Sequence, residues 1–450
     1  MFLNIKEAAC AMNGEYNGKG ESIIAGMFTD SREAFEGGLF FALRGERVDG
    51  HRFVPELNEK GFPCVVADAK YHTGENILVP DVERALGDLA RWWREKYVSR
   101  TKVIAVTGSV GKTTTKDMLG RVFSAEFNTF VPQGNKNSTV GLPMSVAKLT
   151  PAHEYAVFEL GSSRFGEISY LSGIVHPSLS VITCIGSSHL EYFLTRENIR
   201  KEKYGILDGE TPGGYLILDG DSDADFAMRV KIKDHKPVYC GFSDRCDFVL
   251  NIENSRETST EFTVKYRHQK QAIKLYVPGD HAAKDAAYAF AAGVLCGIDP
   301  ETAATAVGQY SPYGDRQRIY DVNGIKVIAD CYNAAPESMV AAFQVLKEQK
   351  SSTRRIAVLG DMLELGKNSD RMHEDVARLV GDAADFVVYI GYFARIFADA
   401  CVGKRVICFD IDQKHEAAAY LKENVIPGDA VLFKASRGVG LETVIKEAGL

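Results

Sequence analysis

The sequence lacks the cysteine pattern of a disulfide-bonded or zinc-binding protein. Its nine cysteines are scattered from Cys10 to Cys408, and no two of them form a C-x-x-C pair. A secreted disulfide framework uses an even number of cysteines, and a zinc cage uses closely spaced pairs. We therefore expect reduced thiols and a cytoplasmic location.

The chain also has no surplus of positive charge. It contains 53 Lys and Arg residues against 60 Asp and Glu residues, which gives a formal net charge of -7. A protein that binds nucleic acid over a broad surface usually carries the opposite balance. We expect no nucleic-acid partner, while local basic sites for small anions stay open.

Long hydrophobic runs are absent as well. A membrane helix needs about 18 apolar residues in succession, and no uninterrupted run approaches that length. The first residues, MFLNIKEAACAMNG, do not combine a basic segment with a long apolar stretch, so they do not resemble a secretion signal. We expect a soluble, unprocessed chain with no membrane insertion.

What is present is an ordinary globular composition, 45% hydrophobic and 25% charged, in 450 residues. At about 150 residues per domain, this length predicts about three domains. Residues 1–98 mix short apolar runs with turns, which predicts a small α/β domain. Residues 99–311 and 312–450 form the other two predicted domains, and the turn-rich segment QYSPYGDRQ marks the boundary between them.

The central domain alternates β-branched runs with helical stretches. The runs KVIAVTG, EYAVFELG, LSVITCIG and GGYLILDGD predict strands of a mostly parallel sheet. FVLNIE, EFTVKYR and AIKLYV predict an antiparallel addition to it. In the third domain, the segments from KVIADCYN to DAVLFKAS predict a second parallel α/β sheet. It has no G-x-G-x-x-G after its first strand, so we do not expect dinucleotide binding there.

The strongest local signal is a glycine-rich loop between a predicted strand and a predicted helix. Its residues are Gly108, Ser109, Val110, Gly111, Lys112, Thr113 and Thr114. Backbone N–H groups in such a loop cradle phosphates, Lys112 reaches the β and γ phosphates, and Thr113 offers a hydroxyl to Mg²⁺. Val106 stands where the usual motif has its first glycine, so a glycine-rich turn that merely contains lysine is the alternative.

A phosphate-binding loop needs metal ligands, which lie at the ends of later strands in a parallel sheet. Glu159 ends AVFELG and His189 follows ITCIGSS, so both are candidate ligands. Alternatively, Glu159 caps the helix near Arg164 and His189 is an ordinary loop residue. Lys203 lies in RENIRKEKYGIL, where the charge pattern by itself favours a solvated helix face.

Further candidate ligands lie outside the central sheet. Asp330, Asp361 and Lys434 fall at or just after predicted strand ends, where open α/β sheets bind ligands, although each of them alone would also suit a cap. Arg316 lies in the interdomain segment, where a guanidinium can reach a phosphate; a surface arginine is the alternative. In the first domain, TDSR predicts a turn or cap, with anion binding by Arg32 as the less favoured reading.

Segments along nearly the whole chain resemble the Mur ligase family, ATP-dependent amide ligases that build the peptide of bacterial peptidoglycan. The resemblance rests on TDSR, GLFFALRGERVDGHRF, TGSVGKTTTKDM, FELGSSRFGEI, DCYNAAPESM and LGDMLELG followed by His373. It implies a UDP-sugar-binding domain, a central ATPase and a Rossmann-like third domain that closes over the nucleotide. It further implies that ATP, with Mg²⁺, drives the joining of D-alanyl-D-alanine to UDP-N-acetylmuramoyl-tripeptide through an acyl phosphate. We expect a monomer.

The resemblance also implies roles for single residues. Lys112 and Thr113 keep their phosphate and Mg²⁺ roles, and Glu159 and His189 resemble metal ligands. Lys203 resembles the family's carbamoylated lysine, which reverses the reading from the helix pattern because a carbamate is a carboxylate-like ligand. The further nucleotide-binding residues are Asp285, Arg316 and Asp330. The substrate-side residues are Ser31, Arg32, Asn135, Asn137, Asp361, Lys434, Ser436 and Arg437.

Several positions depart from the family pattern. The motif G-x-H-N-x-x-N reads Gly279-Asp-His-Ala-Ala-Lys-Asp285 here, so both asparagines are absent. Asp285 can accept a hydrogen bond from an adenine amino group but, when ionised, cannot donate one as an amide does. Ala335, Ala435 and Gly205 replace an Asn, a Gly and a Glu of the family. A Mur-type ligase with a different acceptor or amine, and a non-catalytic nucleotide-binding homologue, therefore stay as alternatives.

Overall fold

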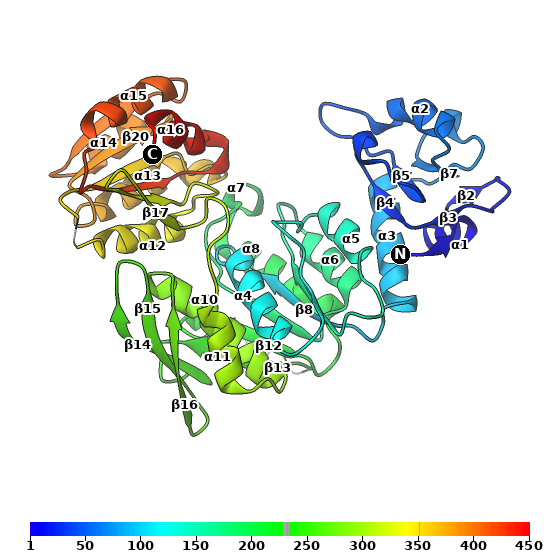
Figure 1. The fold of residues 1–450 in the computed structure, drawn as a ribbon, viewed down its shortest axis with the longest axis horizontal. Helices are drawn as coiled ribbons and strands as arrows, with labels where there is room; N and C mark the ends of the chain where they lie inside the picture. The colour runs from blue at the N-terminus through cyan, green and yellow to red at the C-terminus, as the bar shows by residue number, and fades with distance from the viewer. Residues whose placement is uncertain (228–231, 233, 351) are drawn as a thin grey trace. The chain divides into compact units, whose positions relative to one another are not determined.

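The computed structural model describes residues 1–227, 232, 234–350 and 352–450. These residues form two compact units. The first unit consists of Met1–Thr107, Glu126–Val181 and Tyr204–Tyr215, and the second consists of Gly108–Ala125, Ile182–Lys203 and Leu216–Leu450. Both units combine helices with mostly parallel sheets (Figure 1), as the sequence predicts.

The N-terminal part of the first unit is a small α/β fold. Its five-stranded sheet has the order β2-β7-β6-β5-β4, in which β4 to β7 pair in parallel and β2 is antiparallel. Phe28, Phe40 and Leu57 belong to the apolar cluster beneath it. The elements are β1 (Leu3–Asn4), α1 (Ile5–Ala11), β2 (Glu15–Tyr16), β3 (Ile23–Ile24), β4 (Gly26–Phe28), β5 (Gly38–Phe41), α2 (Val54–Glu59), β6 (Cys64–Val66), β7 (Ile77–Leu78) and α3 (Val82–Lys96).

A buried arginine ties the end of α3 to the rest of the first unit. Arg94 is only 6% exposed. Its guanidinium donates hydrogen bonds to the carbonyls of Val98, Thr101 and Val175 at 2.6, 2.8 and 3.1 Å. Burial lowers the pKa of Arg94. The three carbonyls therefore obtain a donor that water does not supply at this depth.

The central sheet has the strand order β16-β15-β14-β13-β12-β11-β8-β10-β9. Its strands are β8 (Lys102–Thr107), β9 (Thr129–Phe130), β10 (Tyr155–Glu159), β11 (Leu179–Ile182), β12 (Tyr215–Asp219), β13 (Lys236–Gly241), β14 (Phe248–Ser255), β15 (Thr260–Tyr266) and β16 (Gln269–Leu275). β10 is parallel to β8 and to β9, while β14, β15 and β16 form an antiparallel meander. Both patterns confirm the prediction from the sequence.

Helices accompany this sheet in the same stretch of chain. They are α4 (Lys112–Ser124), α5 (Gly141–Val146), α6 (Glu167–Val175), α7 (Leu190–Phe193), α8 (Arg196–Tyr204), α9 (Asp223–Ala227), α10 (Asp280–Leu295) and α11 (Pro300–Gly308). The alanine-rich α10 packs against α4 and α11. A side chain at Gly293 would lie 2.6 Å from Val122, so small residues permit this close approach. In the described part of the chain, every helix is too short or too polar to span a lipid bilayer.

The C-terminal sheet has the order β17-β18-β22-β19-β20-β21. Its strands are β17 (Arg318–Val322), β18 (Ile325–Ala329), β19 (Arg355–Gly360), β20 (Phe386–Ile390), β21 (Arg405–Phe409) and β22 (Ala430–Lys434). All the pairings are parallel except that of β17 with β18. The sequence analysis did not predict β17. Asn323 and Gly324 join it to β18 at positive φ, which suits a two-residue hairpin turn.

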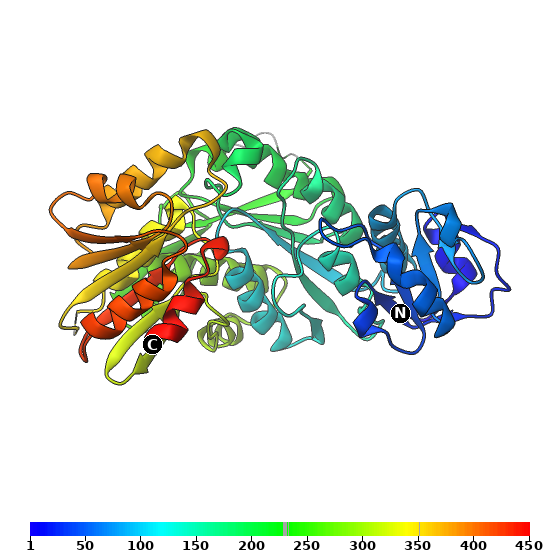
Figure 2. The same ribbon diagram turned by 90° about the horizontal axis from the view of Figure 1, so that it is seen from above.

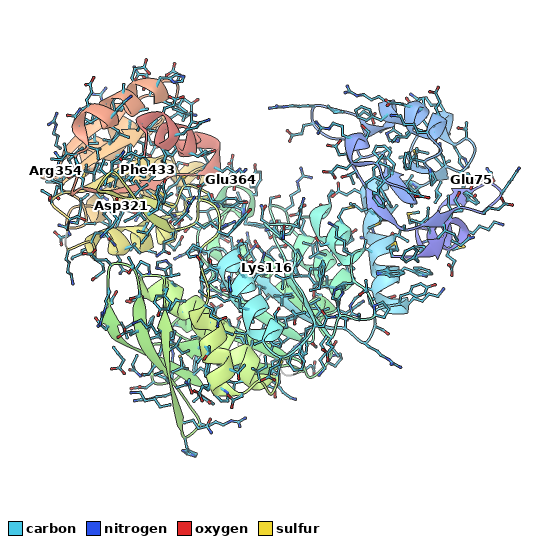
Figure 3. The ribbon with its side chains drawn as sticks, in the orientation of Figure 1. Glu75, Lys116, Asp321, Arg354, Glu364 and Phe433 are labelled. Carbon is cyan, nitrogen blue, oxygen red and sulfur yellow. The ribbon has the colours of Figure 1, made fainter. Side chains whose placement is uncertain are left out.

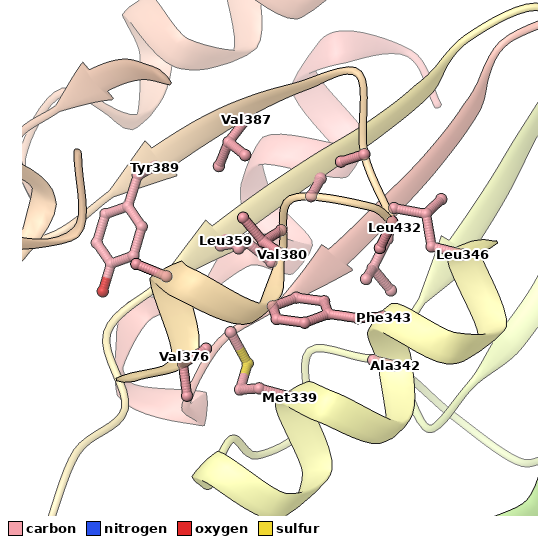
Figure 4. Packing of buried hydrophobic residues seen from close by; sticks show 14 of the residues in the cluster. Met339, Ala342, Phe343, Leu346, Leu359, Val376, Val380, Val387, Tyr389 and Leu432 are labelled. Atoms are coloured by element: carbon pink, nitrogen blue, oxygen red, sulfur yellow. The ribbon is translucent and has the colours of Figure 1, made fainter. Parts of the chain in front are cut away.

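Helices cover both faces of the C-terminal sheet (Figures 1 and 2). They are α12 (Pro336–Lys347), α13 (Ser369–Leu379), α14 (Ala394–Ala400), α15 (Lys414–Asn424) and α16 (Leu441–Ala448). Figure 4 shows Met339, Phe343 and Val376 of α12 and α13 packed with Leu359 and Val387 of the strands. Burial on both faces explains why these strands read as continuous hydrophobic runs in the sequence.

We predict that Arg94→Met lowers the melting temperature of the protein by about 5 °C or more. The change removes the donor of three buried carbonyls, and an unsatisfied buried polar group costs about 1–3 kcal/mol. Differential scanning calorimetry measures the effect. Arg91→Met is the matched control, because Arg91 is exposed and its ion pair with Glu95 lies one helical turn away on the same helix. Equal melting temperatures for the two variants would contradict the role of Arg94.

Candidate functional site

The glycine-rich loop stands between β8 and α4, as predicted. Gly111 is the residue before α4, and Lys112 is the first residue of that helix. The backbone N–H groups of a helix N-terminus, together with the helix dipole, favour an anion at this position. The Lys112 ammonium donates to the carbonyl oxygens of Gly108 at 2.8 Å and of Ser109 at 3.1 Å. The lysine is therefore folded over the loop.

Two positions in the loop require glycine. Gly108 has φ +144° and Gly111 has φ +85°. A Cβ atom at Gly108 would lie 2.1 Å from the Thr183 hydroxyl, and one at Gly111 would lie 2.5 Å from a carboxylate oxygen of Asp285. Both the backbone conformation and the close neighbours exclude larger residues. Val106, which replaces the usual first glycine, lies inside β8 rather than in the loop.

The segment that follows β11 anchors the loop. The N–H of Ser109 donates to the carbonyl of Cys184, and the Ser109 hydroxyl accepts from the N–H of Gly186, both at 2.9 Å. The Thr183 hydroxyl donates to the carbonyl of Val110 at 2.5 Å. These bonds satisfy backbone groups of a loop that has no strand or helix partner of its own.

A buried carboxyl group lies beside the loop. Asp285 on α10 is 8% exposed and faces Gly111. Burial raises the pKa of Asp285 to about 8, opposed by the Thr115 hydroxyl and by the charge of Lys284. A neutral carboxyl at pH 7 does not repel an anion held by the loop. Its predicted contact with adenine stays a prediction.

Glu159, a predicted metal ligand, lies at the end of β10 and is 4% exposed. The side-chain amide of Asn137 donates to its carboxylate at 2.6 Å. The structure thus brings together two residues that the sequence assigned to different roles. The alternative in which Glu159 caps a helix is not what the structure shows: Glu167 accepts the N–H groups of Ser163 and Arg164 there. Asn135 is exposed in the preceding loop.

His189, the second predicted metal ligand, precedes the short helix α7. Its backbone is left-handed, with φ +60°. Its Nδ1 lies 2.5 Å from a carboxylate oxygen of Glu364, which follows β19 in the LGDMLELG segment. The histidine lowers the pKa of Glu364 through this contact. This contact with a carboxylate holds the ring, unlike that of an ordinary loop histidine.

Lys203 lies on α8 but does not share the solvated face that the charge pattern alone favours. It is 2% exposed, while Lys201 of the same helix is exposed. Its ammonium lies 6.0 Å from the centre of the Phe193 ring. The reading of Lys203 as a solvated residue is therefore wrong, because the helix turns this side chain inward. Gly205, where the family has Glu, packs against α6: a Cβ there would lie 3.2 Å from the backbone nitrogen of Ser169.

The C-terminal candidates separate into two groups. Lys434 is 2% exposed, and its ammonium lies 2.6 Å from a carboxylate oxygen of Asp330. This pair joins the ends of β22 and β18. Asp361 is fully buried and accepts hydrogen bonds from the Tyr389 hydroxyl and from the N–H groups of Tyr392 and Phe393. Asp361 therefore stabilises the turn after β20, as its cap reading proposed, and its substrate role stays a prediction.

Two predicted arginines meet at one aromatic ring. The guanidinium of Arg316 lies 3.6 Å from the centre of the Tyr332 ring, and that of Arg437 lies 5.1 Å from it. Neither arginine has an ion pair within the described residues. Beside them, the hydroxyl of buried Ser436 accepts a hydrogen bond from the N–H of Leu363 at 2.9 Å. The ring thus holds two cations close together, an arrangement suited to an anionic ligand.

Ser31 and Arg32 form a short turn in the first unit. Asp30 caps this turn by accepting from the N–H of Arg32, and it pairs with the Arg32 guanidinium at 2.5 Å. The arginine lowers the pKa of Asp30 to about 2. The turn predicted from TDSR is confirmed. The Arg32 side chain is 86% exposed, so it is accessible to a ligand.

The sequence analysis did not identify three residues of this site: Tyr332, Glu337 and Glu364. The side chain of Glu337 accepts from the Ser187 hydroxyl at 2.9 Å and pairs with Arg196 at 2.5 Å. All three lie within DCYNAAPESM and LGDMLELG, the segments that carried the family resemblance. Their position in these segments was the signal that the sequence offered. It does not indicate their partners, which come from distant parts of the chain.

Models of three protein domains match the chain. The Mur ligase middle domain matches residues 106–293, the Mur ligase glutamate ligase domain matches residues 316–437, and the Mur ligase family catalytic domain matches residues 23–94. The matches therefore fall on the regions of the five-stranded, nine-stranded and six-stranded sheets.

Characterised relatives match along nearly the full length. The UDP-N-acetylmuramoyl-tripeptide–D-alanyl-D-alanine ligase of Bacillus subtilis is 35% identical, covering 95% of this chain and 93% of the relative. The ligase of the same name from Treponema pallidum is 32% identical, with 98% of each chain covered. The one from Escherichia coli is 29% identical, with 99% and 98% covered.

Solved structures agree with the sequence relatives. A crystal structure of MurF from Acinetobacter baumannii matches with a TM-score of 0.93 at 30% identity, covering 100% of this chain and 99% of that chain. MurF ligase from Thermotoga maritima, crystallised in complex with ADP, matches with a TM-score of 0.83 at 28% identity, covering 94% and 97%.

We predict that Asp285→Asn stabilises the protein increasingly as the pH rises from 5 to 8. In the unfolded chain Asp ionises near pH 4, whereas in the folded protein the pKa is about 8. Between these values only the unfolded state loses the proton, so wild-type stability falls with rising pH. We expect the variant to melt about 3 °C or more above wild type at pH 8 and closer to it at pH 5. A pH-independent difference would contradict a protonated Asp285.

Proposed function

We infer the function of this protein from its family: the chain belongs to the Mur ligase family. We propose that it is an ATP-dependent ligase that joins D-alanyl-D-alanine to UDP-N-acetylmuramoyl-tripeptide, with release of ADP and phosphate, in the synthesis of the peptidoglycan precursor. The three relatives described above carry this name and cover 95 to 99% of the chain. The MurF–ADP complex supports the use of ATP.

We propose that the work is divided among three domains. Residues 1–98 bind the UDP sugar, residues 99–311 bind ATP, and residues 312–450 receive the dipeptide and complete the nucleotide site. The positions of the matched domain models support this division, as does the presence of a sheet in each segment.

The burial of Lys203 is the observation that favours catalysis over nucleotide binding alone. Lys203 is only 2% exposed, and carbamoylation would replace its ammonium with an anionic group that a metal ion can neutralise. Addition of CO₂ to the amine gives a carbamate, which is a carboxylate-like metal ligand. A protein that only bound nucleotide would have no need of such a ligand in addition to its phosphate loop.

The donor set fits Mg²⁺. Among the described residues, no group of three or more His, Cys, Asp or Glu side chains is arranged to hold a metal. Mg²⁺ does not need such a cage, because it binds one or two protein ligands together with substrate phosphates and water. We propose two Mg²⁺ positions, with Thr113, Glu159, His189 and carbamoylated Lys203 as the residues that hold the two ions. When bound, Mg²⁺ offsets the negative charge of the phosphates.

The reaction follows from what the loop can bind. Lys112 now donates to two loop carbonyls, and ATP phosphates would take their place as stronger, charged acceptors. The terminal carboxylate of the tripeptide attacks the γ phosphorus, which gives an acyl phosphate and ADP. The amine of D-alanyl-D-alanine then attacks the acyl carbon, phosphate leaves, and the nitrogen loses a proton to form the amide. The loop amides and Lys112 stabilise the charge in transfer.

The decisive experiment is a product assay. The purified protein is incubated with ATP, Mg²⁺, UDP-N-acetylmuramoyl-tripeptide and D-alanyl-D-alanine, and the pentapeptide is identified by mass. Matched reactions omit the dipeptide or replace it with a single amino acid. Ligation of another amine or acceptor instead would favour a related Mur-type ligase, and no turnover with any pairing would favour a non-catalytic homologue.

We predict that Lys203→Ala lowers the ligation rate by about 100-fold or more, because it removes a metal ligand at the transferring phosphate. Short carboxylates such as acetate should restore part of the rate by replacing the carbamate. Lys201→Ala is the matched control, since this exposed lysine lies on the same helix. A wild-type ligation rate in Lys203→Ala would contradict the assignment of Lys203 as a carbamoylated lysine.

A further inference from the structure

We propose that Glu364 is a positioning residue that orients His189 for metal binding. This inference rests on the proposed function, and it adds a residue of the third domain to the support of the metal site. Its basis is a direct contact: Nδ1 of His189 and Oε2 of Glu364 lie 2.5 Å apart (Glu364 is labelled in Figure 3).

The contact leaves one ring nitrogen of His189 for a metal. A carboxylate beside Nδ1 holds a proton on that nitrogen, so Nε2 keeps its lone pair. Within the described residues, Nε2 has no hydrogen-bond partner. Histidines that bind metals usually donate their other N–H to a carboxylate or carbonyl, which fixes the ring and raises its basicity. The carboxylate of Glu364, 2.5 Å from Nδ1, lies where such a supporting group is needed.

The backbone at both residues argues that the contact is not kept for stability. His189 has φ +60° and Glu364 has φ +62°. Each left-handed residue other than glycine costs about 1–3 kcal/mol. The side chains are 27% and 44% exposed, and a contact this exposed contributes about 0–1 kcal/mol even when both groups are charged. The backbone strain therefore costs more free energy than the contact contributes. This difference indicates a functional reason for the geometry.

The loop that carries Glu364 is held firmly on both sides. The N–H of Met362 donates to the buried His373 ring at 2.9 Å, which fixes the start of the loop. At its end, a Cβ on Gly366 would lie 3.0 Å from the Cα of Glu191, so the two backbones are in close contact. The N–H of Glu191 also donates to the Glu364 carbonyl at 2.9 Å.

An apolar cluster supports the same contact. Leu190, Phe193 and Ile199 are buried together, and Met372 of α13 packs against them. Glu364 therefore meets His189 through a docked segment and not through a single long side chain. Glu337 binds the same stretch of chain at Ser187, two residues before the histidine. Two glutamates of the C-terminal segment thus fix the residues around His189.

The test measures metal binding separately from catalysis. Mn²⁺ is titrated into the full-length protein in the presence of ADP, and free Mn²⁺ is followed by electron paramagnetic resonance. We expect Glu364→Ala to raise the Mn²⁺ dissociation constant about 10- to 100-fold, the range for loss of such a supporting carboxylate. Glu364→Gln, which keeps an acceptor without the charge, should give a smaller increase. Glu374→Ala is the matched control, because Glu374 on α13 pairs with Arg378 of the same helix.

A double-mutant cycle separates positioning from general packing. If Glu364 acts through His189, the double variant His189→Ala/Glu364→Ala binds Mn²⁺ no more weakly than His189→Ala alone. Additive effects, or wild-type affinity in a folded Glu364→Ala or Glu364→Gln, would overturn the proposal. Failure of wild type to form pentapeptide would reject the proposed function and leave these binding results unaffected.

Discussion

The backbone polar groups of the loop from Gly108 to Gly111 impose the constraint on which the site depends. The loop lies between a strand and a helix, so its N–H and C=O groups need partners from elsewhere. The segment after β11 supplies them through Thr183 and Cys184, and the N–H of Gly186 holds the Ser109 hydroxyl. This anchoring fixes the start of the stretch that leads to His189, and it leaves the remaining N–H groups of the helix N-terminus directed at an anion.

The structure of the loop also determines which charged groups lie around it. Because Gly111 has no side chain, Asp285 can lie against the loop, and burial there keeps its carboxyl protonated at pH 7. Lys112 bonds to loop carbonyls that a phosphate would replace. On the C-terminal sheet, Asp330 compensates the buried Lys434, while Arg316 and Arg437 share the Tyr332 ring. Positive charge is therefore left available where anionic substrates are proposed to bind.

Most helices and strands were predictable from the sequence. Strands buried on both faces form continuous hydrophobic runs, and amphipathic helices show the 3.6-residue spacing of their apolar residues. β17 was missed although Asn323-Gly324 is a hairpin signal, since its own residues are half-exposed and mixed in character. The loop, Glu159 and His189 were found from their positions after strands. Lys203 shows where the local sequence pattern fails. Its charged neighbours predict a solvent-exposed side chain, whereas the packing of α8 buries it.

The sequence by itself determined the fold class, the glycine-rich loop and the family, because these depend on local periodicity and on ordered motifs. Only the tertiary structure decided which side chains meet. Glu364 and His189 are far apart in the chain, and their contact depends on how α7 docks against the loop after β19. Likewise, Asp361 turns into the protein to hold the turn at Tyr392, while Lys434 pairs with Asp330. Residue type and spacing indicate which chemistry each side chain is capable of. Three-dimensional packing sets its partner, its exposure and its charge.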